Sequence, residues 1–418
     1  LRIKETQVRE LILQGITDAE KYVEAEKLAA SRDLDTWFEG IRRSPRDLEY
    51  RNKMEFSFGD AYKDGPLALG LHKKGSFYDI VTADGCRIVD ADYRSILRAT
   101  LDFFSERGLK HYHKKRRSGY LRHLMVRKAL HTGEILVDLV TADYGEMVVF
   151  PVDGPSDEAS LLSAFVNALR ELSLDGEIVG ILHTRNNAVA DIIRDEGTTV
   201  LYGKDRFCET LLGLTFQVTP FSFFQTNSYG AEVLYDTARR YLLETAGEAG
   251  REVADAAVLT DKINDTSVIK YRTLYDLYCG TGTITQLMAP AAEKVIGVEI
   301  VEEAVEAARE NAAANGIDNC RFIAGDVLKV LDTIPEKPDA IILDPPRDGV
   351  HPKALPRILS YGVRDILYIS CKPKSLARDL PAILAAGYRP VRGCCVDEFP
   401  HTDNIETICL FRNTESVA

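Results

Sequence analysis

The chain has 418 residues, of which 45% are hydrophobic and 28% are charged, and its net charge is -12. This composition is typical of a globular protein large enough to hold two or three domains. No apolar run reaches the length of a membrane helix, and the charged first residues do not resemble a secretory signal, so we expect a cytoplasmic protein. The eight cysteines have no regular spacing, which predicts reduced thiols and no disulfide framework.

Periodic patterns predict different structures in the first and middle parts of the chain. Residues 4–30 carry apolar side chains at mostly helical spacing, so we expect an N-terminal helical segment over 1–45. Short strand patterns follow around 53–60, 67–73, 79–86, 124–130 and 135–141, with helical patterns near 91–107 and 156–173. These patterns predict a smaller α+β domain over residues 46–215.

A basic segment lies inside this α+β region. Between Ser105 and Lys128 the sequence carries nine lysine or arginine residues against one acid, with Tyr112 and Tyr120 interleaved. Such a segment can follow a phosphate backbone while its tyrosines stack on unpaired bases, although a solvated charged face has the same composition. The negative net charge argues against unspecific nucleic-acid binding, so any RNA contact is expected to be local.

Beyond residue 273, apolar strand patterns alternate with helical patterns. The strands are expected in TLYDLYCGTGT, KVIGVEI, CRFIAGD, DAIILDPPR and DILYISC. This order predicts an α/β domain over residues 216–418, with a parallel sheet covered on both faces and ligands beyond the carboxyl ends of its strands. Within it, the acid-rich residues 244–273 are expected to form an inserted helix or an exposed loop.

The first glycine-rich turn points to a nucleoside cofactor. Gly280 and Gly282 allow a tight turn close to a ligand, and Glu299 follows at the place where a ribose hydroxyl is bound. A dinucleotide motif requires a third glycine where this sequence has Thr285, which disfavours a nicotinamide-dependent oxidoreductase. S-adenosylmethionine, which has a ribose but no pyrophosphate, fits better. Asp326 is expected either to bind the adenine amino group or to cap a helix.

The next two strands end in residues that suit base methylation. Asp344, two prolines and Arg347 form a rigid wall after the fourth strand, whereas base amino-methyltransferases have an aromatic residue at the position of Arg347. This departure favours a target other than an exocyclic amine. Cys371 ends the fifth strand before Lys372 and Lys374, whose charges are expected to lower its pKa, although a buried apolar role is the alternative.

A thiolate is needed when the methylated atom is carbon 5 of a pyrimidine. Attack of the thiolate on C6 makes C5 nucleophilic, and a base must then remove the C5 proton. Glu406 is the candidate base. Spacing alone does not separate it from Asp397, Glu398, His401 and Asp403.

Five motifs together resemble the RNA uracil-5-methyltransferases. They are PFSFFQTN, DLYCGTGT, LDPPRDGV, YISCKPKSLARDL and FPHTDNIETICLF, and the resemblance covers the chain from about Tyr50 to its end. It implies a Rossmann-like class I methyltransferase domain with a doubly wound, mostly parallel sheet, preceded by an α+β RNA-binding domain. It also implies that Cys371 is the nucleophile and Glu406 the base. The implied S-adenosylmethionine contacts are Gln225, Tyr278, Gly280, Thr283, Glu299, Asp326 and Asp344.

One departure from the family concerns a metal cluster. Members that act on large-subunit ribosomal RNA typically hold a [4Fe–4S] cluster with four cysteines, and Cys86 resembles the fourth of these ligands. No cysteine precedes Cys86, and one thiol cannot hold a cluster, so no metal site is expected in this chain. We expect the chain to be a fragment of a longer protein, the alternative being a lineage that has lost the cluster, and a cluster is expected only if an N-terminal extension supplies the other ligands.

The sequence leaves two other functions open. A base amino-methyltransferase that uses the DPPR motif would not need Cys371, and a non-catalytic RNA-binding protein would need neither Cys371 nor Glu406. The expected partner is RNA, ribosomal rather than transfer RNA, and the expected protein is a monomer without membrane contact. The target uridine must leave its stack to reach the thiol, which favours loops and bulges.

Overall fold

The computed structural model describes residues 1–76, 79–113, 116–143, 157–188, 192–243 and 271–414. The chain divides into two compact units. Unit 1 consists of Leu1–Asp47, Leu211–Phe216 and Phe223–Ala418, and unit 2 of Leu48–Thr210 and Gln217–Ser222. Within the described residues, no helix combines the length and the apolar character that crossing a membrane requires.

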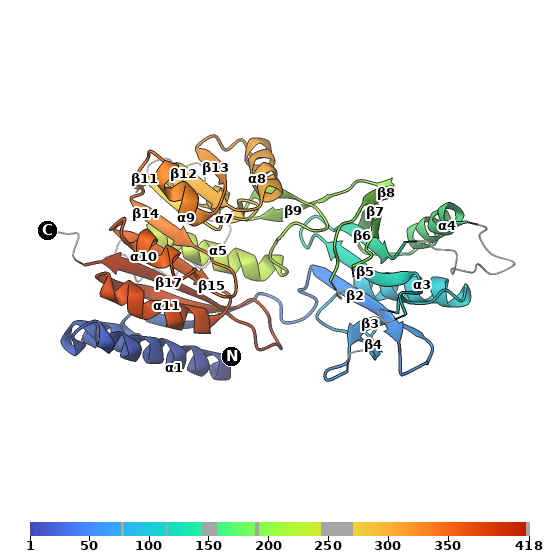
Figure 1. Cartoon of the computed structure of the whole chain (residues 1–418), viewed down its shortest axis with the longest axis horizontal. Helices are drawn as coiled ribbons and strands as arrows, with labels where there is room; N and C mark the ends of the chain where they lie inside the picture. Colours follow the sequence, from blue (N-terminus) through green and yellow to red (C-terminus); the bar gives the residue numbers. More distant parts are fainter. Residues whose placement is uncertain (77–78, 114–115, 144–156, 189–191, 244–270, 415–418) are drawn as a thin grey trace. The chain divides into compact units, whose positions relative to one another are not determined.

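Unit 1 is an α/β structure built around an eight-stranded sheet (Figure 1). Its strands are β1 (Phe38–Arg43), β11 (Tyr271–Leu277), β12 (Ala292–Glu299), β13 (Cys320–Ala324), β14 (Ala340–Leu343), β15 (Asp365–Ser370), β16 (Tyr388–Asp397) and β17 (Glu406–Asn413). Its α-helices are α1 (Arg2–Asp18), α2 (Ala29–Arg32), α5 (Ser228–Leu243), α7 (Thr283–Leu287), α8 (Glu302–Ala314), α9 (Val327–Val330), α10 (Ala354–Leu359) and α11 (Pro373–Ala385). Short 3-10 turns cover Ala19–Lys21, Ala25–Leu28, Leu34–Thr36, Ala289–Ala291 and Leu331–Thr333.

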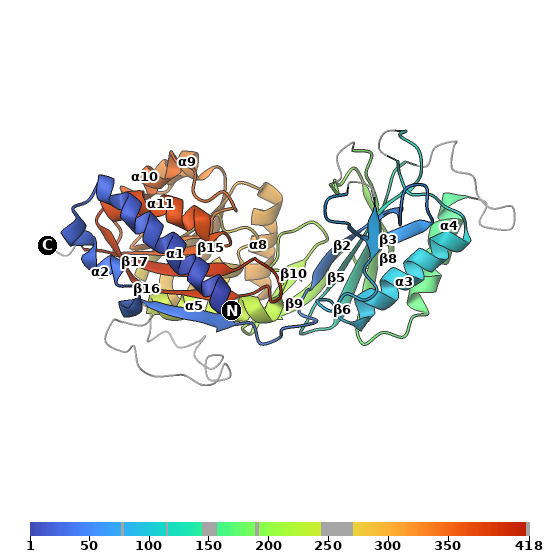
Figure 2. The ribbon, with the colours of Figure 1, turned by 90° about the horizontal axis from the view of Figure 1, so that it is seen from below.

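The sheet has the order β1-β16-β17-β15-β14-β11-β12-β13. Strands β15, β14, β11, β12 and β13 are parallel, and β17 runs antiparallel to both β15 and β16. Helices α1, α9, α10 and α11 cover one face, whereas α5, α7 and α8 contact the other (Figure 2). The doubly wound, mostly parallel sheet predicted from the alternating strand and helix patterns is therefore confirmed.

The first residues of the chain take part in this sheet. Strand β1 pairs in parallel with β16, so that Phe38 lies opposite Gly393 and Arg43 opposite Asp397. Helix α1 packs beside α11 and buries Val8, Ile12 and Ile16 in the same core as the strands. The sequence pattern predicted the helix, but it gave no sign that a strand from residues 38–43 extends the sheet.

Unit 2 is an α+β structure with a seven-stranded sheet of order β4-β3-β2-β5-β6-β7-β8. Its strands are β2 (Lys53–Asp60), β3 (Leu67–His72), β4 (Ile80–Thr82), β5 (Leu121–Lys128), β6 (Glu134–Thr141), β7 (Glu177–Arg185) and β8 (Thr198–Gly203). Its helices are α3 (Ala91–Glu106) and α4 (Glu158–Arg170). Two further strands, β9 (Phe207–Leu211) and β10 (Leu214–Val218), pair as a hairpin whose residues are divided between unit 2 and unit 1.

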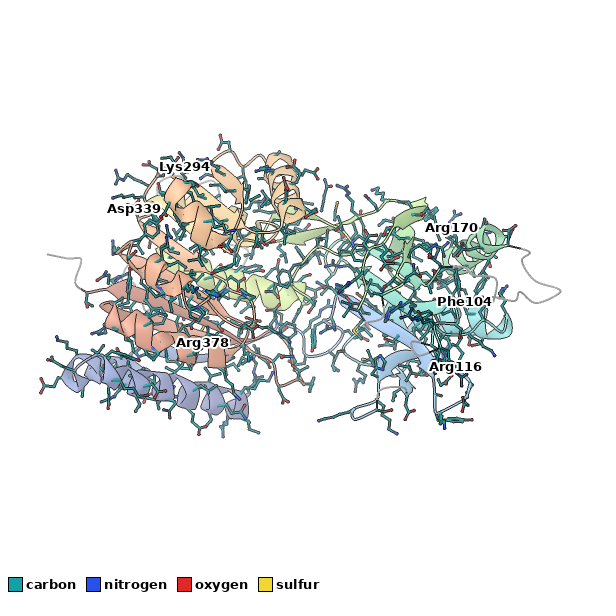
Figure 3. The ribbon with its side chains drawn as sticks, viewed as in Figure 1. Phe104, Arg116, Arg170, Lys294, Asp339 and Arg378 are labelled. Atoms are coloured by element: carbon teal, nitrogen blue, oxygen red, sulfur yellow. The ribbon has the colours of Figure 1, made fainter. Side chains whose placement is uncertain are left out.

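The core of unit 2 lies between its sheet and its two helices. Phe103 and Phe104 of α3 meet Phe165 of α4 at ring-centroid distances of 5.5 and 5.1 Å. Figure 3 labels Phe104 in this core. Each helix begins with an aspartate, Asp90 or Asp157, whose side chain accepts hydrogen bonds from backbone N–H groups of the first turn. Aromatic packing and capping together hold both helices on the same face of the sheet.

Candidate active site

The predicted site residues of unit 1 gather at one edge of its sheet. Tyr278, Glu299, Asp326, Asp344 and Cys371 all lie at or just after the carboxyl ends of parallel strands. The antiparallel strand β17 begins at Glu406, so its first residue lies at this same edge. Ligands of doubly wound sheets bind at such an edge.

The turn after β11 has a backbone that few residue types adopt. Tyr278, Gly280 and Gly282 all have positive φ, at 72°, 54° and 75°. The N–H groups of Tyr278 and Cys279 both donate to the carbonyl of Val298, which ties the turn to the neighbouring strand β12. Thr283 then opens the short helix α7 and is buried. The sequence predicted this tight turn from its two glycines.

Glu299 is held in place by three backbone donors. Its Oε2 accepts from the N–H of Gly280 at 3.0 Å, and its Oε1 accepts from the N–H groups of Ile300 and Val301 at 2.8 and 3.0 Å. A carboxylate has about four acceptor positions, so about one position on Oε2 is left for a ligand donor such as a ribose hydroxyl. The carboxylate also stands at the N-terminus of α8, where negative charge is favoured.

A pocket of about 200 Å³ adjoins this carboxylate. Its lining includes Tyr278, Glu299, Ile300 and Asp326, from three different strand ends. Asp326 caps α9 because its Oδ1 accepts from the N–H of Leu328 at 2.8 Å. The helix-capping role, which the sequence left open against adenine binding, is therefore present, and the same residue also lines the pocket.

Thr285 has a structural role at the position where a dinucleotide motif has glycine. Its hydroxyl donates to Oδ2 of Asp276 at 2.6 Å, in the interior of the unit. Burial raises the pKa of Asp276 to about 7, and the bond from Thr285 opposes this rise. A glycine at 285 would leave that buried carboxyl without this partner.

The DPPR wall is anchored by helix α11. The hydroxyl of Ser375 donates to the carbonyl of Arg347 at 2.6 Å. The guanidinium of Arg378, a residue labelled in Figure 3, donates to the carbonyls of Asp348 and Val350 at 2.6 and 3.1 Å. Asp379, which is buried, accepts from the N–H of Val350 at 3.2 Å. We call this group of contacts the α11 clasp.

The α11 clasp also explains part of the SLARD motif that follows the cysteine. Asp379 accepts from the hydroxyl of Tyr368 on β15 at 2.8 Å and is paired with the guanidinium of Arg378. The same helix therefore fixes the end of β14, which carries Asp344, and the end of β15, which carries Cys371. The segments that follow Asp344 and Cys371 are therefore held by contacts with the same helix.

Cys371 lies in a tight turn between β15 and α11. The hydroxyl of Ser370 donates to the carbonyl of Lys372 at 2.9 Å, which closes the turn around the thiol. Burial raises the pKa of Cys371 to about 11, and the negative charges of Glu406 and Asp344 add to this rise. Arg347 acts in the opposite direction. The thiol of the free protein is therefore protonated at neutral pH.

Strand pairing brings Glu406 next to Cys371. Ser370 of β15 lies opposite Thr407 of β17 in an antiparallel pair, so the next step along the ladder sets Cys371 opposite Glu406. Directly opposed residues of antiparallel strands have Cα atoms about 4.5–5.5 Å apart. Glu406 is 3% exposed, and burial together with the charge of Asp344 raises its pKa to about 8. Such a carboxyl can act as a base near neutral pH.

The structure separates Glu406 from three of its four competitors. The carboxylate of Asp397 is paired with the ammonium of Lys4 at 2.6 Å. His401 and Asp403 are exposed in the turn that joins β16 to β17. Glu398, by contrast, is fully buried, and the charge of Glu406 acts on it.

Asp344 and Gln225 complete this part of the site. Burial and the charge of Asp276 raise the pKa of Asp344 to about 7. Gln225 is 9% exposed and hydrogen-bonds Tyr235 of α5, whose hydroxyl senses the charges of Asp344 and Glu398. Gln225 therefore adjoins the carboxyl groups of Asp344, Glu398 and Glu406. The 200 Å³ pocket is lined by other residues.

Comparison with known proteins places these features in a family. A model of the tRNA (uracil-5-)-methyltransferases matches residues 256–414. The chain is 46% identical over 379 residues to an uncharacterized RNA methyltransferase of Clostridium tetani, covering 90% of this chain and 75% of that protein. A similar relative in Caldanaerobacter subterraneus is 44% identical over 380 residues, with coverages of 91% and 76%. The chain belongs to the RNA uracil-5-methyltransferase family.

A solved structure supports the fold of this RNA methyltransferase. It is the tRNA (uracil-54, C5)-methyltransferase of Pyrococcus abyssi in complex with S-adenosyl-L-homocysteine. It is 24% identical, covers 93% of this chain and 83% of its own, and has a TM-score of 0.66. At this level of identity the likeness shows the fold, which confirms the class I methyltransferase architecture.

The structure assigns the cationic influence on Cys371 to a residue other than those predicted. Lys372 and Lys374 are exposed, and the charge that lowers the thiol pKa comes from Arg347. The prediction of a pKa below the ordinary value was wrong, because burial and two carboxylates outweigh the single arginine. A linear sequence shows the neighbouring lysines but not the carboxylates across the sheet edge.

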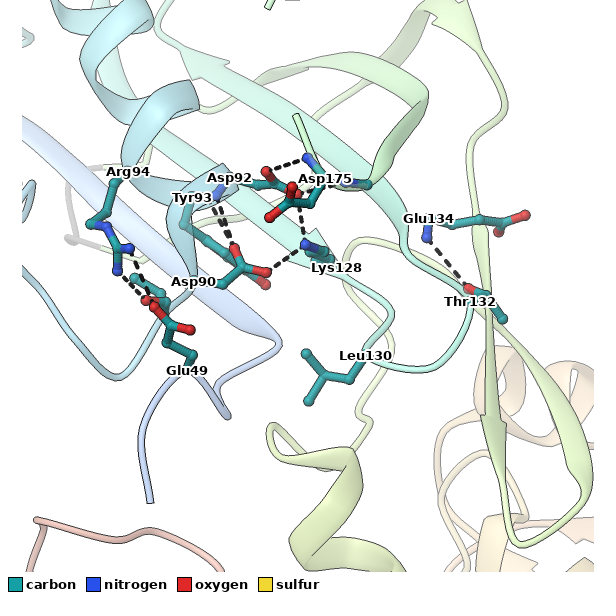
Figure 4. Close-up of polar contacts among 12 residues, drawn as sticks. Glu49, Asp90, Asp92, Tyr93, Arg94, Lys128, Leu130, Thr132, Glu134 and Asp175 are labelled. Carbon is teal, nitrogen blue, oxygen red and sulfur yellow. Dashed lines mark hydrogen bonds and ion pairs between the residues drawn. The ribbon is translucent and has the colours of Figure 1, made fainter. Parts of the chain in front are cut away.

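The basic segment of this methyltransferase is less available than its sequence indicated. Arg122, Arg127 and Lys128 lie on the buried strand β5, and Lys128 is paired with Asp90 and Asp92 inside unit 2 (Figure 4). Arg127 donates from Nη1 to three backbone carbonyls, those of residues 219, 220 and 222.

Tyr120 is fully buried as well, and its hydroxyl donates to Glu158 at 2.7 Å. Tyr120 therefore cannot stack on a base. The guanidinium of Arg122 lies over the ring of Tyr112, 4.7 Å from the ring centroid. The exposed cations of the segment are Lys110, Arg116 and Arg117, and residues 114–115 lie outside the described ranges. Any RNA contact of the segment therefore rests on its loop and not on its strand.

Two remaining predictions concern metal binding and the acid-rich insertion. Cys86 packs against the apolar core of unit 2, and its carbonyl accepts from the guanidinium of Arg94. Among the residues that the structure describes, no group of three or more His, Cys, Asp and Glu is placed to hold a metal ion. Most of the insertion expected over 244–273 lies outside the described residues, whereas residues 271–273 belong to β11.

Proposed function

We propose that this protein transfers a methyl group to C5 of a uridine in RNA, with Cys371 as the nucleophile and Glu406 as the base. The observation that carries this proposal is the β15–β17 pairing, which sets the thiol and the carboxyl opposite each other at the ligand edge. A base amino-methyltransferase has no need for a thiol and a carboxyl in this arrangement. The same pairing would be a coincidence in a protein that only binds RNA.

In the proposed reaction, the sulfur of Cys371 forms a bond to C6 of the uracil ring. The π electrons of the C5–C6 bond move towards C4 and O4, which makes C5 nucleophilic. The thiol must first lose its proton, and a positive charge close to the sulfur favours this loss because it stabilises the thiolate. Arg347 supplies one such charge, and the N-terminus of α11, which begins at Pro373, adds a positive helix end near the sulfur.

Glu406 completes the reaction by taking the proton from C5. As the C5–H bond breaks, its electrons restore the C5–C6 double bond, and the bond between C6 and sulfur breaks. The buried carboxyl is suited to this step because its pKa of about 8 makes its conjugate base stronger than an exposed carboxylate. The thiolate then leaves and the enzyme is regenerated.

S-adenosylmethionine supplies the electrophilic methyl group when bound. The residues that would hold it are Glu299 at the ribose, Asp326 and Tyr278 along the pocket, and the backbone of Gly280 and Thr283 in the turn. The free acceptor position on Glu299 and the pocket beside it fit this cofactor. We assign Asp344 and Gln225 to the end of the cofactor nearest to Cys371.

We propose ribosomal RNA as the substrate, with transfer RNA as the alternative. The support is Cys86, which stands at the place of a cluster ligand in the ribosomal RNA members that the sequence resembles, and the α+β unit. We further propose a cytoplasmic monomer. The target uridine must be extruded from its stack, which costs a few kcal/mol in a duplex and less in a loop.

The deciding experiment uses RNA that contains 5-fluorouridine. Fluorine at C5 cannot be removed as a proton, so a protein that follows this route stays covalently attached after methyl transfer. The wild type incubated with S-adenosylmethionine should form an adduct that resists denaturing electrophoresis, and Cys371→Ala should form none. An adduct that survives Cys371→Ala, or none with the wild type, would refute the mechanism.

Glu406→Gln tests the base with ordinary RNA. The variant should attack and methylate the uracil but fail to remove the C5 proton, so a methylated protein–RNA adduct accumulates. Rapid product release by this variant would show that the base lies elsewhere. Running both assays with ribosomal and with transfer RNA compares the two substrate classes, and methyl transfer to an exocyclic amine would identify the amino-methyltransferase alternative.

A further inference from the structure

One carboxyl group of the site has no role in the proposed reaction. Glu398 follows directly after β16 and is 0% exposed. Within the described part of the chain, neither of its carboxyl oxygens has a hydrogen-bond partner. Buried polar atoms are nearly always paired, so an unpaired carboxyl in an active site calls for a ligand.

The position of Glu398 is fixed by its surroundings. Its backbone carbonyl accepts from Nδ2 of Asn227 at 2.6 Å. Its Cγ lies so close to Gly230 that a Cβ on this glycine would come within 2.7 Å. A side chain at position 230 would therefore displace the stem of Glu398, and the glycine at the start of α5 leaves room for it.

Glu398 lies on the same side of the sheet edge as the base. Val396 is paired with Glu406, and Glu398 comes two residues after Val396, which makes it the diagonal neighbour of Glu406. Diagonal neighbours are about 7–8 Å apart, a separation that long side chains span. The side chain of Glu398 is thus a neighbour of Glu406, whose charge acts on it.

The ionisable groups that act on Glu398 are acidic, so each is either neutral or negatively charged. They are Glu406 of β17 and Asp344 after β14, and the hydroxyl of Tyr235 on α5 faces the same cluster. Among the described residues, no lysine or arginine forms an ion pair with Glu398, whereas Arg347 acts on Glu406 and Cys371. Burial and the two carboxylates raise the pKa of Glu398 well above its ordinary value, which favours the neutral form of this carboxyl group.

A neutral carboxyl group carries an O–H donor, and the proposed reaction provides an acceptor for it. When sulfur bonds to C6, the electrons that leave the C5–C6 double bond place negative charge on O4. Donors that are already in position where such charge develops are among the strongest contributions to catalysis.

We propose that the protonated carboxyl of Glu398 donates a hydrogen bond to O4 of the target uracil and stabilises the negative charge that forms there. This inference rests on the proposed function, because it concerns the same attack by Cys371. The O–H bond of Glu398 is not broken, and the proton from C5 still goes to Glu406. Glu398 is therefore a catalytic residue that acts as a fixed donor.

The same contact would discriminate between pyrimidines. Uracil presents an acceptor at position 4, whereas cytosine presents an amino donor there. A donor from Glu398 pairs with O4 and meets another donor on cytosine, so the contact favours uracil. The substrate class expected of this site is thus a 4-oxo pyrimidine.

Two variants test the role of this donor. Glu398→Gln keeps an N–H donor of similar size that cannot ionise, and Glu398→Met keeps the size without a donor. The assay is the initial rate of covalent adduct formation with 5-fluorouridine RNA, measured between pH 6 and pH 10. For Glu398→Met we expect a rate about 100- to 1,000-fold below the wild type, the usual loss when one oxyanion donor is removed.

The pH dependence separates a donor from a purely structural residue. At a pH high enough to ionise Glu398, the wild type loses the donor and gains a negative charge beside O4. Glu398→Gln undergoes no such change, so the rate of the wild type divided by that of Glu398→Gln should fall as the pH rises. Because both proteins share Cys371, Glu406 and Asp344, the titration of these groups largely cancels in the ratio.

Several outcomes would overturn this inference. A wild-type rate in Glu398→Met would do so, as would a ratio that stays constant from pH 6 to pH 10. If Glu398→Met does not fold, as judged by thermal unfolding, the ratio for Glu398→Gln decides alone. Glu303→Gln, which removes an exposed carboxyl on α8, is the matched control and should follow the wild type throughout. Absence of an adduct with the wild type contradicts the proposed function itself, whereas normal adducts with both variants contradict only the role of Glu398.

Discussion

The raised pKa of Cys371 predicts that this thiol reacts slowly with alkylating reagents in the free protein. The pKa rises from an ordinary value near 9 to about 11, so the thiolate fraction at pH 7 falls about 100-fold. A thiolate of higher pKa is also a better nucleophile, by about tenfold for a shift of this size. The two effects leave an alkylation rate about tenfold below that of an unperturbed thiol.

The charge of Glu406 offers a direct way to test the cause. Its pKa is about 8, so it is mostly protonated at pH 7 and ionised at pH 9. Glu406→Gln should therefore leave the reactivity of Cys371 unchanged at pH 7 and increase it at pH 9, where the wild type has an extra negative charge beside the sulfur. The assay is alkylation by iodoacetamide, followed by mass spectrometry of the peptide that carries Cys371.

Two results would refute this reasoning. One is alkylation of Cys371 at pH 7 as fast as a cysteine in an unstructured peptide, which would mean that burial and the carboxylates do not suppress the thiolate. The other is equal reactivity of wild type and Glu406→Gln at pH 9.

Two further predictions concern the loops that hold the site. Gly280→Ala should lower the free energy of unfolding by about 1–2 kcal/mol, because position 280 has a positive φ. Gly282→Ala should lower it by a further ~1–3 kcal/mol, because the new Cβ would lie 2.6 Å from Phe322. Equal midpoints of urea unfolding for the two variants would contradict this order. Asp379→Asn should cost about 1–3 kcal/mol, since its carboxylate accepts from Tyr368, and should slow adduct formation by loosening the α11 clasp. An unchanged rate in a destabilised Asp379→Asn protein would show that the clasp does not position the thiol.

Much of the site could be predicted from the sequence because parallel strands share one ligand edge. Glu299, Asp344 and Cys371 each follow an apolar strand pattern, and such residues meet at the carboxyl edge of a doubly wound sheet. The glycines of the first turn were equally plain, since few other residues adopt their φ angles. The fold class followed from the same alternating pattern.

The rest depends on contacts between residues that are far apart in the chain. The role that we propose for Glu398 could not be recognised, because its closeness to Glu406, and its lack of a hydrogen-bond partner within the described ranges, depend on the pairing of β16 with β17. The pKa of Cys371 was misjudged for the same reason. In the basic segment, a count of charges could not show that Arg127 and Lys128 of strand β5 are buried. Arg127 donates to backbone carbonyls there, and Lys128 is paired with carboxylates.

The place of β1 in the sheet also bears on how the protein is made. Phe38 pairs with Gly393, so strand β1 finds its partner only after all the residues between them have been synthesised. Unit 2 is almost contiguous in the chain and can fold while translation continues, whereas the sheet of unit 1 stays incomplete until β17 has emerged. At about 5–20 residues per second, the 203 residues from 210 to 413 take roughly 10–40 s to add. During that interval the apolar face of helix α1, formed by Val8, Ile12 and Ile16, lacks the complete sheet that covers it in the folded unit, and this nascent chain is the form most exposed to chaperones and proteases.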